Sequence, residues 1–347
     1  MERLRFRTWN LNENGDLVIG ISAIMNYEAM NMINLKDKKI LVTGGGGFLG
    51  THVVQKLKAR GVPEGHIRVP RAEASDLRKF EACEEAVRGM DMVIHLAGVT
   101  GDAEFHRAHP AQIFYDNLSM GIQLMEAARR AGIEKFLVAG SATEYPENAP
   151  LPFREENLWI GPFAKLHAPY TVVKKMLGVQ TEAYRAQYGF NGIHLLFTNM
   201  YGPGKEAVRG FVITNIIRRI MDAQQAGADF IEVWGTGKAM RDFLYVEDAA
   251  EGVLLAAEHY DKSDPVNLGS GWEISIRELA DTVSTLMEFK GEIRWDRAMP
   301  DGQLRRILDT TRAEREFGFR AETSFKEGLR KTIEWQRANP GALSPQS

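Results

Sequence analysis

Cysteine, long apolar runs and an excess of one sign of charge are all scarce in this sequence of 347 residues. The single cysteine, Cys83, cannot form a disulfide within the chain, which fits a reducing cytoplasm. It lies in the helical pattern FEACEEAVRG, without basic neighbours that would activate its thiol. We therefore interpret Cys83 as a packing residue and expect a cytoplasmic protein.

No apolar run approaches the length that crosses a membrane, so we expect no membrane partner. The short run LVIGISAIM at 17–25 follows acidic residues and lacks a small-residue cleavage pattern, which argues against a signal peptide. Lys and Arg number 43 against 46 Asp and Glu, giving a net charge of −3, and no basic stripe is present. Nucleic acid is therefore not an expected partner.

Short apolar runs alternate with amphipathic helical patterns between Lys39 and Asn199. The first run, KILVT, is continuous, as expected for a strand that is buried on both faces of a sheet. Four further runs follow it, namely HIRVP, VIHLAG, EKFLVAGSA and NGIHLLFTN. This alternation predicts an α/β fold with a Rossmann-like, doubly wound parallel sheet.

Five glycines follow the first predicted strand, in TGGGGFLG at 43–50. Gly44, Gly47 and Gly50 give the spacing G-x-x-G-x-x-G between a strand and a helix. Because glycine has no Cβ atom, such a turn is tight and lets a pyrophosphate approach the amides at the helix N-terminus. We predict dinucleotide binding here rather than a flexible loop, and the residues expected at the cofactor are Gly44, Gly47, Phe48, Leu49 and Gly50.

The sequence VPRAEASDL after the second predicted strand bears on which dinucleotide binds. No carboxylate stands directly at the strand end, where it would hold a ribose 2′-hydroxyl, whereas Arg71 can pair with a 2′-phosphate. This favours NADP(H), while Glu73 keeps NAD(H) as the alternative. Asp76 and Leu77 are expected to border the adenine, although Asp76 fits a helix cap equally well.

The domain organisation follows from these patterns. Residues 1–37 have no clear periodicity and are expected to form an N-terminal extension. Residues 38–200 are expected to be the dinucleotide-binding domain, and 201–347 mainly a smaller α/β substrate lobe, with returning segments near 241–269. Two helix starts in the lobe fit a capping box, at Ser275 with Glu278 and at Ser324 with Glu327.

Tyr170 and Lys174 stand four residues apart in HAPYTVVKK, on one face of a predicted helix. A neighbouring ammonium favours the phenolate and lowers the pKa of a tyrosine from about 10. Such a tyrosine can give a proton to a carbonyl oxygen while hydride reaches the carbonyl carbon. Ser141, at the end of the preceding strand, can hydrogen-bond the same oxygen. A Tyr and a Lys at this spacing usually lie on a solvated helix face. Here they follow a glycine turn and a strand that ends in serine, and this order of motifs indicates a catalytic pair.

This order of motifs resembles the extended short-chain dehydrogenase/reductase family and, within it, the NAD-dependent epimerases and dehydratases. The resemblance covers roughly 38–337 and rests on TGGGGFLG, HLAG, GSATEYP, YTVVK, TNMYGPG and RDFLYVEDAA. It implies an enzyme with an NADP-binding Rossmann domain, a sugar-nucleotide substrate and a homodimer. The resemblance makes Ser141, Tyr170 and Lys174 the catalytic triad, with Lys174 also on the nicotinamide ribose.

The same resemblance places further residues by their motifs. Leu96, Ala97 and Gly98 of HLAG would border the cofactor, and Asn199 would lie near both nicotinamide and substrate. The residues expected to line the nucleotide-sugar site are Arg219, Trp234, Arg241, Asp301 and Arg305. Arg241 is the expected pyrophosphate ligand, because a guanidinium can bind phosphate oxygens bidentately. For each of these five residues the alternative is an ordinary salt bridge or a loop or helix position.

The stretch MPDGQLRRILDTTR resembles the branch of the family that epimerises a 4-keto sugar before reducing it. That branch uses a cysteine and a histidine, and the matching positions here are Thr143 and Phe211, so double epimerisation is not expected. Thr143 remains a catalytic candidate because it occupies the position of that cysteine. His167 and Glu206 are the alternatives as replacement acid or base, although a lone histidine at a helix start is more often structural.

Three functions remain open from the sequence. The first is NADPH-dependent reduction of a 4-keto-6-deoxy sugar linked to a nucleoside diphosphate. The second is C4 epimerisation with retained NAD, since GSATEYP is also similar to the matching stretch of such epimerases. The third, a non-catalytic dinucleotide sensor, ranks below both because Tyr170 and Lys174 are both present. No metal site is expected.

Overall fold

The computed structural model describes residues 32–71, 74–204, 211–299 and 301–340. The chain divides into two compact units, 1–34 and 35–347, and the elements below belong to the second. The expected extension at 1–37 and the candidate base Glu206 lie wholly or largely outside the described residues.

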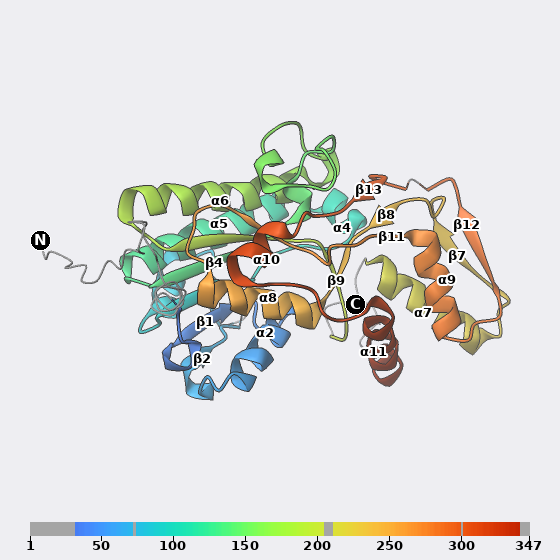
Figure 1. The fold of residues 1–347 in the computed structure, drawn as a ribbon, viewed down its shortest axis with the longest axis horizontal. Helices are drawn as coiled ribbons and strands as arrows, with labels where there is room; N and C mark the ends of the chain where they lie inside the picture. The colour runs from blue at the N-terminus through green and yellow to red at the C-terminus, as the bar shows by residue number, and fades with distance from the viewer. Residues whose placement is uncertain (1–31, 72–73, 205–210, 300, 341–347) are drawn as a thin grey trace, which may run out of the picture. The chain divides into compact units, whose positions relative to one another are not determined.

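A parallel sheet of six strands runs through the described part of the second unit (Figure 1), in the order β10-β5-β4-β3-β1-β2. Its strands are β1 (Ile40–Thr43), β2 (Ile67–Arg68), β3 (Met92–His95), β4 (Lys135–Ser141), β5 (Gly192–Phe197) and β10 (Val266–Leu268). β1 and β3 are buried along their whole length, which confirms the two-sided burial expected of KILVT. The strand order reverses between β1 and β3, and in such sheets ligands bind beside the carboxyl ends at that point.

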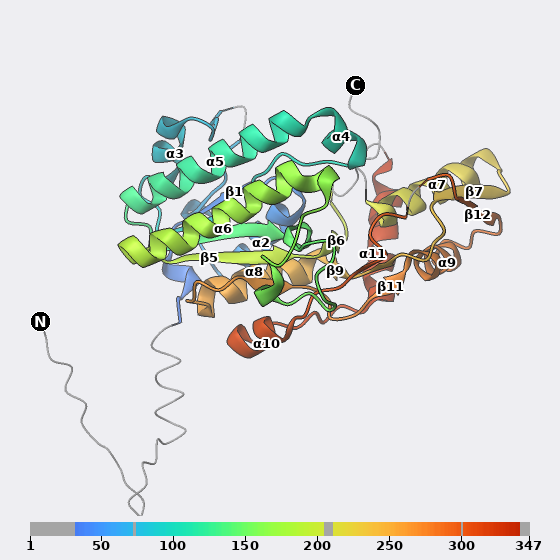
Figure 2. The same cartoon turned by 90° about the horizontal axis from the view of Figure 1, so that it is seen from above.

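Helices cover both faces of this sheet, which confirms the doubly wound fold. α2 (Phe48–Ala59) and α8 (Val246–His259) pack together on one face, with α10 (Thr311–Phe317) beside α8. The other face carries α3 (Phe80–Val87), α5 (Pro110–Arg130) and α6 (Ala168–Tyr188), and α5 and α6 lie side by side (Figure 2). The short α4 (Ala103–Ala108) precedes α5 and contacts the start of α6. The core between sheet and helices includes Phe136, Leu124 and Leu177.

A smaller lobe follows α6 and β5 in the chain. Its helices are α7 (Val212–Ala226), α9 (Ile276–Leu286) and α11 (Phe325–Ala338). Its strands are β7 (Phe230–Trp234) paired with β12 (Glu292–Asp296), and β8 (Met240–Arg241) between β11 (Ile274–Ser275) and β13 (Arg305–Arg306). A parallel pair, β6 (Asn199–Tyr201) and β9 (Phe243–Tyr245), joins the lobe to the central sheet region. The lobe has its own apolar core, with Ile217, Val283 and Leu329 fully buried.

The helix starts of the lobe test two local expectations. At α9 the capping box is complete, because Ser275 Oγ accepts the Glu278 amide at 3.1 Å and the Glu278 carboxylate accepts the Ser275 amide at 3.0 Å. At α11 Ser324 Oγ accepts the Glu327 amide at 3.4 Å. The Glu327 carboxylate instead pairs with Arg330, so the side-chain cap of α11 is one-sided.

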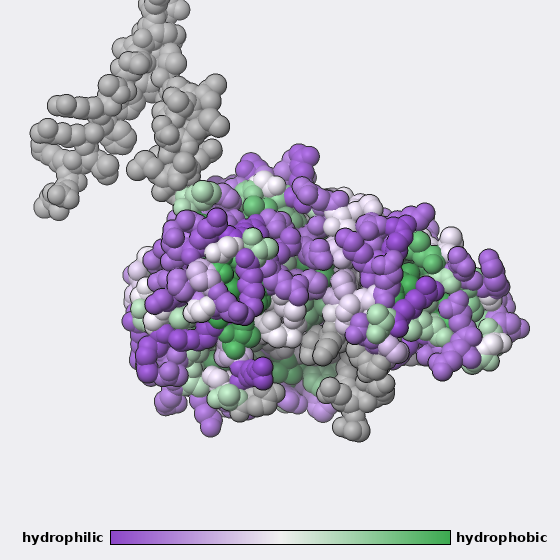
Figure 3. All heavy atoms as spheres, turned by 90° about the horizontal axis from the view of Figure 1, so that it is seen from below, coloured by the Kyte–Doolittle hydropathy of each residue, from purple (hydrophilic) through white to green (hydrophobic). Residues whose placement is uncertain are grey.

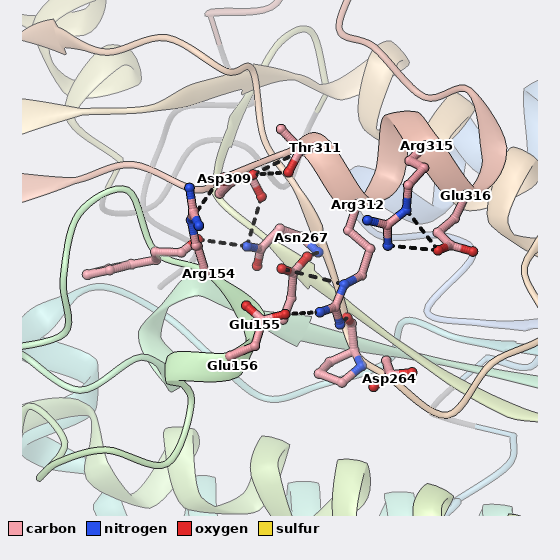
Figure 4. A network of polar contacts seen from close by, with 12 residues as sticks. Arg154, Glu155, Glu156, Asp264, Asn267, Asp309, Thr311, Arg312, Arg315 and Glu316 are labelled. Carbon is pink, nitrogen blue, oxygen red and sulfur yellow. Dashed lines mark hydrogen bonds and ion pairs between the residues drawn. The ribbon is translucent and has the colours of Figure 1, made fainter.

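The chain after β13 returns to the sheet and is held there by a buried polar network (Figure 4). Asn267 of β10 donates to the carbonyls of Phe153 and Asp309 at 2.9 and 3.0 Å, and Tyr145 donates to Asn267 at 2.8 Å. Arg312 of α10 donates to Pro265 O at 2.9 Å and pairs with Glu155 and Glu156. Because Asn267, Tyr145 and Glu155 are buried and hydrogen-bonded, they fix the loop after β4 and the end of the lobe in one arrangement.

Among the described residues, no helix is both long enough and apolar enough to cross a membrane. The face that bears α2 and α8, seen from below in Figure 3, is mainly hydrophilic, and its apolar colouring is broken into separate small patches. Larger exposed apolar side chains lie instead on α5 and α6, on the opposite face of the sheet.

Candidate active site

The glycine-rich turn has the geometry of a dinucleotide cradle. Gly44 adopts φ +67°, a conformation that side-chain-bearing residues rarely take, and the Gly47 amide donates to its carbonyl at 2.9 Å. A Cβ on Gly50 would lie 2.0 Å from Gly44 O, so the first turn of α2 touches the turn itself. A Cβ on Gly46 would meet no heavy atom within 4 Å. The open side of the turn thus faces away from the protein, where a pyrophosphate can reach the N-terminus of α2.

The residues expected at the adenosine end have different surroundings. Arg71 is exposed after β2, and Glu73 is outside the described residues. Asp76 accepts from Arg78 at 2.8 Å, and this ion pair holds the pKa of Asp76 below its usual value. Leu77 is buried, and its carbonyl accepts from the Cys83 thiol at 3.1 Å. Cys83 itself is buried and its pKa is raised by desolvation, as expected for a packing residue.

The loop after β3 borders both the glycine turn and the tyrosine–lysine pair. A Cβ on Gly44 would lie 2.7 Å from Ala97 N, so the backbone of Leu96 and Ala97 packs directly against the glycine turn. Asn117 of α5 holds this loop, accepting from Val99 N at 2.7 Å and donating to Val99 O at 2.8 Å. A Cβ on Gly98 would lie 3.9 Å from Lys174 Nζ. The tertiary structure therefore places HLAG next to Lys174.

Tyr170 and Lys174 lie in the first two turns of α6, which begins at Ala168 and has Pro169 at a favourable position in its first turn. Lys174 Nζ is 5.5 Å from the centroid of the Tyr170 ring. Ser141 ends β4, and Thr143 bonds its Oγ through both the amide, at 3.2 Å, and the hydroxyl, at 3.1 Å. Thr171 donates to Thr143 O at 3.2 Å, which ties the serine turn to α6 beside Tyr170.

The electrostatics of the pair correct one expectation from the sequence. Burial, and next the carboxylate of Glu144, raise the pKa of Tyr170, whereas the neighbouring ammonium was expected to lower it. Burial lowers the pKa of Lys174 to about 8, and Glu144 partly opposes this shift. Desolvation thus outweighs the attraction between phenolate and ammonium in the cofactor-free protein. Glu144 is fully buried and accepts the Ser141 amide at 2.8 Å.

Two histidines pack beside Tyr170. The His106 ring of α4 lies 4.8 Å from the His167 ring and 5.9 Å from the Tyr170 ring, centroid to centroid. Burial lowers the pKa of both imidazoles, and that of His167 falls to about 4 with further help from His106 and Arg306. His106 was not predicted from the sequence, because 64 positions separate it from Tyr170 and no local motif marks it.

The substrate lobe presents two partly buried arginines. Arg241 of β8 and Arg306 of β13 are direct neighbours in the parallel register. Arg241 donates to Met240 O at 2.7 Å and to Asp301 O at 3.4 Å, and burial lowers its pKa. Burial and then the charge of Arg241 lower the pKa of Arg306 to about 10. Two partly buried cations held side by side form a site suited to a dianion.

Arg305 was predicted from the sequence to line the nucleotide-sugar site, but it is Arg306 that lies beside Arg241. Arg305 is exposed and forms an ion pair with Glu273, while its neighbour is directed inward. Successive residues of a strand point to opposite faces, and this alternation was the signal available in the sequence for choosing between the two arginines.

The remaining expected substrate residues occupy three places. Arg219 of α7 donates to Glu232 O and lies 5.9 Å from the Trp234 ring, which is 59% exposed. Asp301 accepts the amide and hydroxyl of Thr236, both at 2.6 Å. Asn199 donates to Asp242 O at 3.2 Å. The structure therefore brings Arg241 and Asp301 together and places Arg219 with Trp234.

Thr143 and Phe211 occupy the positions where the epimerising branch of the family has a cysteine and a histidine. Thr143 lies beside Ser141, and Phe211 is an exposed residue that precedes α7. In the ranges that the structure describes, no group of three or more His, Cys, Asp or Glu side chains is arranged to hold a metal ion.

Comparisons with known proteins agree on one family. The family model of the NAD dependent epimerase/dehydratase family matches residues 40–269. The probable GDP-L-fucose synthase 1 of Oryza sativa subsp. japonica is 33% identical over 312 residues, covering 88% of this chain and 93% of the relative.

Two solved structures share the fold over most of the chain. One is a GDP-L-fucose synthetase from Naegleria fowleri bound to NADP, with a TM-score of 0.80 and 27% identity over 90% of this chain and 96% of that chain. The other is a GDP-mannoheptose C4 reductase from Campylobacter jejuni with NADP bound, with a TM-score of 0.79 and 25% identity over 87% and 99%.

Proposed function

Because the chain belongs to the NAD dependent epimerase/dehydratase family, we propose that it is an NADPH-dependent enzyme that reduces the 4-keto group of a sugar carried on guanosine diphosphate. The named activities of its relatives support the nucleotide and the C4 position, and the NADP in two of them supports the cofactor. A 6-deoxy sugar, as expected from the sequence, is the proposed substrate class.

The observation that carries the proposal is the position of Lys174 between Tyr170 and the loop after β3. Its ammonium is 5.5 Å from the phenol ring and close to the Gly98 backbone at the cofactor crevice. The glycine turn fits a dinucleotide, since the Gly50 side of the turn is filled by backbone and the Gly46 side is open. A phenol, an ammonium and a pyrophosphate cradle at one strand switch point are the parts that hydride transfer to a carbonyl requires.

Each residue then has a separate task. The Tyr170 hydroxyl donates its proton to the keto oxygen, and the Ser141 hydroxyl holds the same oxygen by a hydrogen bond. The Lys174 ammonium stabilises the phenolate that results and binds the nicotinamide ribose. NADPH, when bound, supplies the hydride to the keto carbon. Because Tyr170 is partly buried and desolvation raises its pKa, its hydroxyl is protonated at neutral pH and is ready to act as the acid.

The lobe holds the other end of the substrate. Arg241 and Arg306 bind the diphosphate, whose two charges compensate the desolvation of both guanidinium groups. Trp234 and Arg219 lie on the exposed strand and helix of the lobe, where they can cover the nucleoside. The diphosphate and the keto carbon are thus held by different parts of the fold, which orients the sugar.

Reduction and retained-NAD epimerisation are separated by one experiment. Purified protein is assayed by NADPH and NADH absorbance against a panel of GDP- and UDP-linked 4-keto-6-deoxy sugars. We expect stoichiometric NADPH oxidation with the GDP sugar. Stoichiometric bound NAD, with sugar conversion and no consumption of reduced cofactor, would instead establish the epimerase.

The role of Tyr170 is tested on the same assay. Tyr170→Phe should abolish turnover and keep NADPH affinity, because only the hydroxyl is lost. Tyr188→Phe, at the exposed end of the same helix, is the matched control and should keep full activity. Activity of Tyr170→Phe equal to that of the unaltered enzyme would refute the assignment.

The assembly proposed is a homodimer through α5 and α6. Their outer side exposes Phe114, Tyr115, Ile122, Met176 and Val179, large apolar side chains on two helices that lie side by side. Such a surface commonly marks an interface, and a two-fold contact would bury it against its own copy. Val179→Glu should therefore give monomers in light scattering after size-exclusion chromatography, while Gln55→Glu on exposed α2 should not. A dimer that survives Val179→Glu together with Ile122→Glu would exclude this interface.

A further inference from the structure

His106 is the common neighbour of His167 and Tyr170. Its ring contacts both other rings nearly edge to face, at interplanar angles of 81° and 84°. The side chain is 5% exposed, and its Nδ1 atom is buried without a hydrogen-bond partner among the described residues. Nε2 lies 3.3 Å from the Thr100 hydroxyl. A buried imidazole with one free nitrogen, placed beside the proposed acid, is unusual enough to require a reason.

We propose that His106 relays to Tyr170 the proton that replaces the one given to the substrate, and that His167 delivers it from the solvent side. The inference rests on the proposed function, because it concerns how the acid is restored between turnovers. His106 acts through Tyr170 and not on the substrate itself.

The chemistry needs no further reactant. After each reduction Tyr170 is a phenolate, and the enzyme must take one proton from water before the next turnover. A neutral imidazole can accept a proton at one nitrogen and release one from the other. A proton taken up by His167 passes to His106, and His106 gives one to the Tyr170 oxygen. The O–H bond of Tyr170 reforms, both histidines return to neutrality, and no group in the relay is oxidised or reduced.

The surroundings favour neutral rings at pH 7. Burial lowers the pKa of His106, and the nearby carboxylate of Asp102, which caps α4, only partly opposes this. Burial, then His106 and Arg306 of the lobe, lower the pKa of His167. Glu144 and Lys174 are the charged groups that face Tyr170 from the turn after β4 and from α6. Neutral rings keep one N–H and one lone pair each, which a relay requires and a fixed cation lacks.

Packing alone is the competing explanation for the histidine cluster. His106→Phe separates the two, because phenylalanine keeps an aromatic ring against His167 and Tyr170 but cannot carry a proton. In the first turnover Tyr170 is already protonated, so a relay defect leaves that turnover unchanged and slows those that follow. A packing defect would misplace Tyr170 and slow all turnovers alike.

The experiment is stopped-flow NADPH oxidation at a high enzyme concentration, with NADPH and the keto-sugar nucleotide in several-fold excess over active sites. For His106→Phe we expect a burst of one NADPH per site at the unaltered rate, then a steady state about 10- to 100-fold slower. His109→Phe, directly after α4 and packed against Phe105, should show no such slowing. A steady state equal to that of the unaltered enzyme, or equal slowing of burst and steady state, would overturn the relay.

A second measurement keeps the relay separate from the proposed function. If the unaltered enzyme oxidises NADPH with none of the keto-sugar nucleotides in the panel, the proposed function fails. The contact itself is then tested without substrate by nitrogen NMR of labelled histidine. Tyr170→Phe should change the tautomer balance or titration of the His106 ring, and unchanged signals would overturn the relay independently of any turnover.

Discussion

The buried charge of Lys174 is expected to lower the free energy of unfolding of the protein. Lys174 is 3% exposed and burial lowers its pKa from 10.5 to about 8, so the folded, cofactor-free protein holds the charge unfavourably. One pKa unit corresponds to about 1.4 kcal/mol, and the shift therefore amounts to about 3 kcal/mol at pH 7. Methionine has nearly the same shape without the charge. Lys174→Met should raise the free energy of unfolding by up to about 3 kcal/mol while abolishing reduction.

The pH dependence gives the sign of this effect. The folded pKa of Lys174 is below its unfolded value, so the unfolded state binds the proton more tightly and the penalty is complete below pH 8. It disappears as pH rises through about 8 towards 10.5, so the gain of Lys174→Met should narrow over that window.

Urea unfolding of cofactor-stripped protein at pH 7, 8, 9 and 10 measures the difference. Lys165→Met, at an exposed lysine just before α6, is the control and should stay within about 0.5 kcal/mol at every pH. A Lys174→Met protein that is no more stable at pH 7, or whose gain does not shrink with rising pH, would refute the reasoning.

Three further predictions follow from single contacts. Gly50→Ala should abolish NADPH binding and lower the free energy of unfolding by about 1 to 3 kcal/mol, because its Cβ would overlap Gly44 O. Gly46→Ala is the control and should leave thermal stability unchanged. Equal melting temperatures for the two variants would contradict the turn geometry. Arg306→Leu should raise the KM for the sugar nucleotide about 10- to 100-fold through lost charge-assisted bonds and leave the KM for NADPH unchanged, as read from initial rates. Cys83, buried with a pKa of about 12, should resist a disulfide reagent in the native protein and react fully in denaturant; rapid native reaction would contradict its burial.

Much of the architecture was readable from local sequence. The continuous run before TGGGGFLG predicted a buried strand, and β1 with its glycine turn and α2 confirms it. The four-residue spacing of Tyr170 and Lys174 placed them on one face of a helix, and they lie together at the start of α6. The capping box at Ser275 was likewise predicted from spacing alone and is confirmed. Each of these depends on interactions within a few residues, so the pattern carries the information.

Only the tertiary structure decided the environment of those residues. His106 meets Tyr170, and Arg306 meets Arg241, across separations of 64 and 65 positions, because α4 packs on α6 and β13 pairs with β8. The direction of the pKa shift of Tyr170 was predicted wrongly for the same reason, since spacing shows the neighbouring ammonium but not the depth of burial. Spacing along the chain determines which groups share a helix face, whereas desolvation and contacts between distant elements depend on how the whole fold closes.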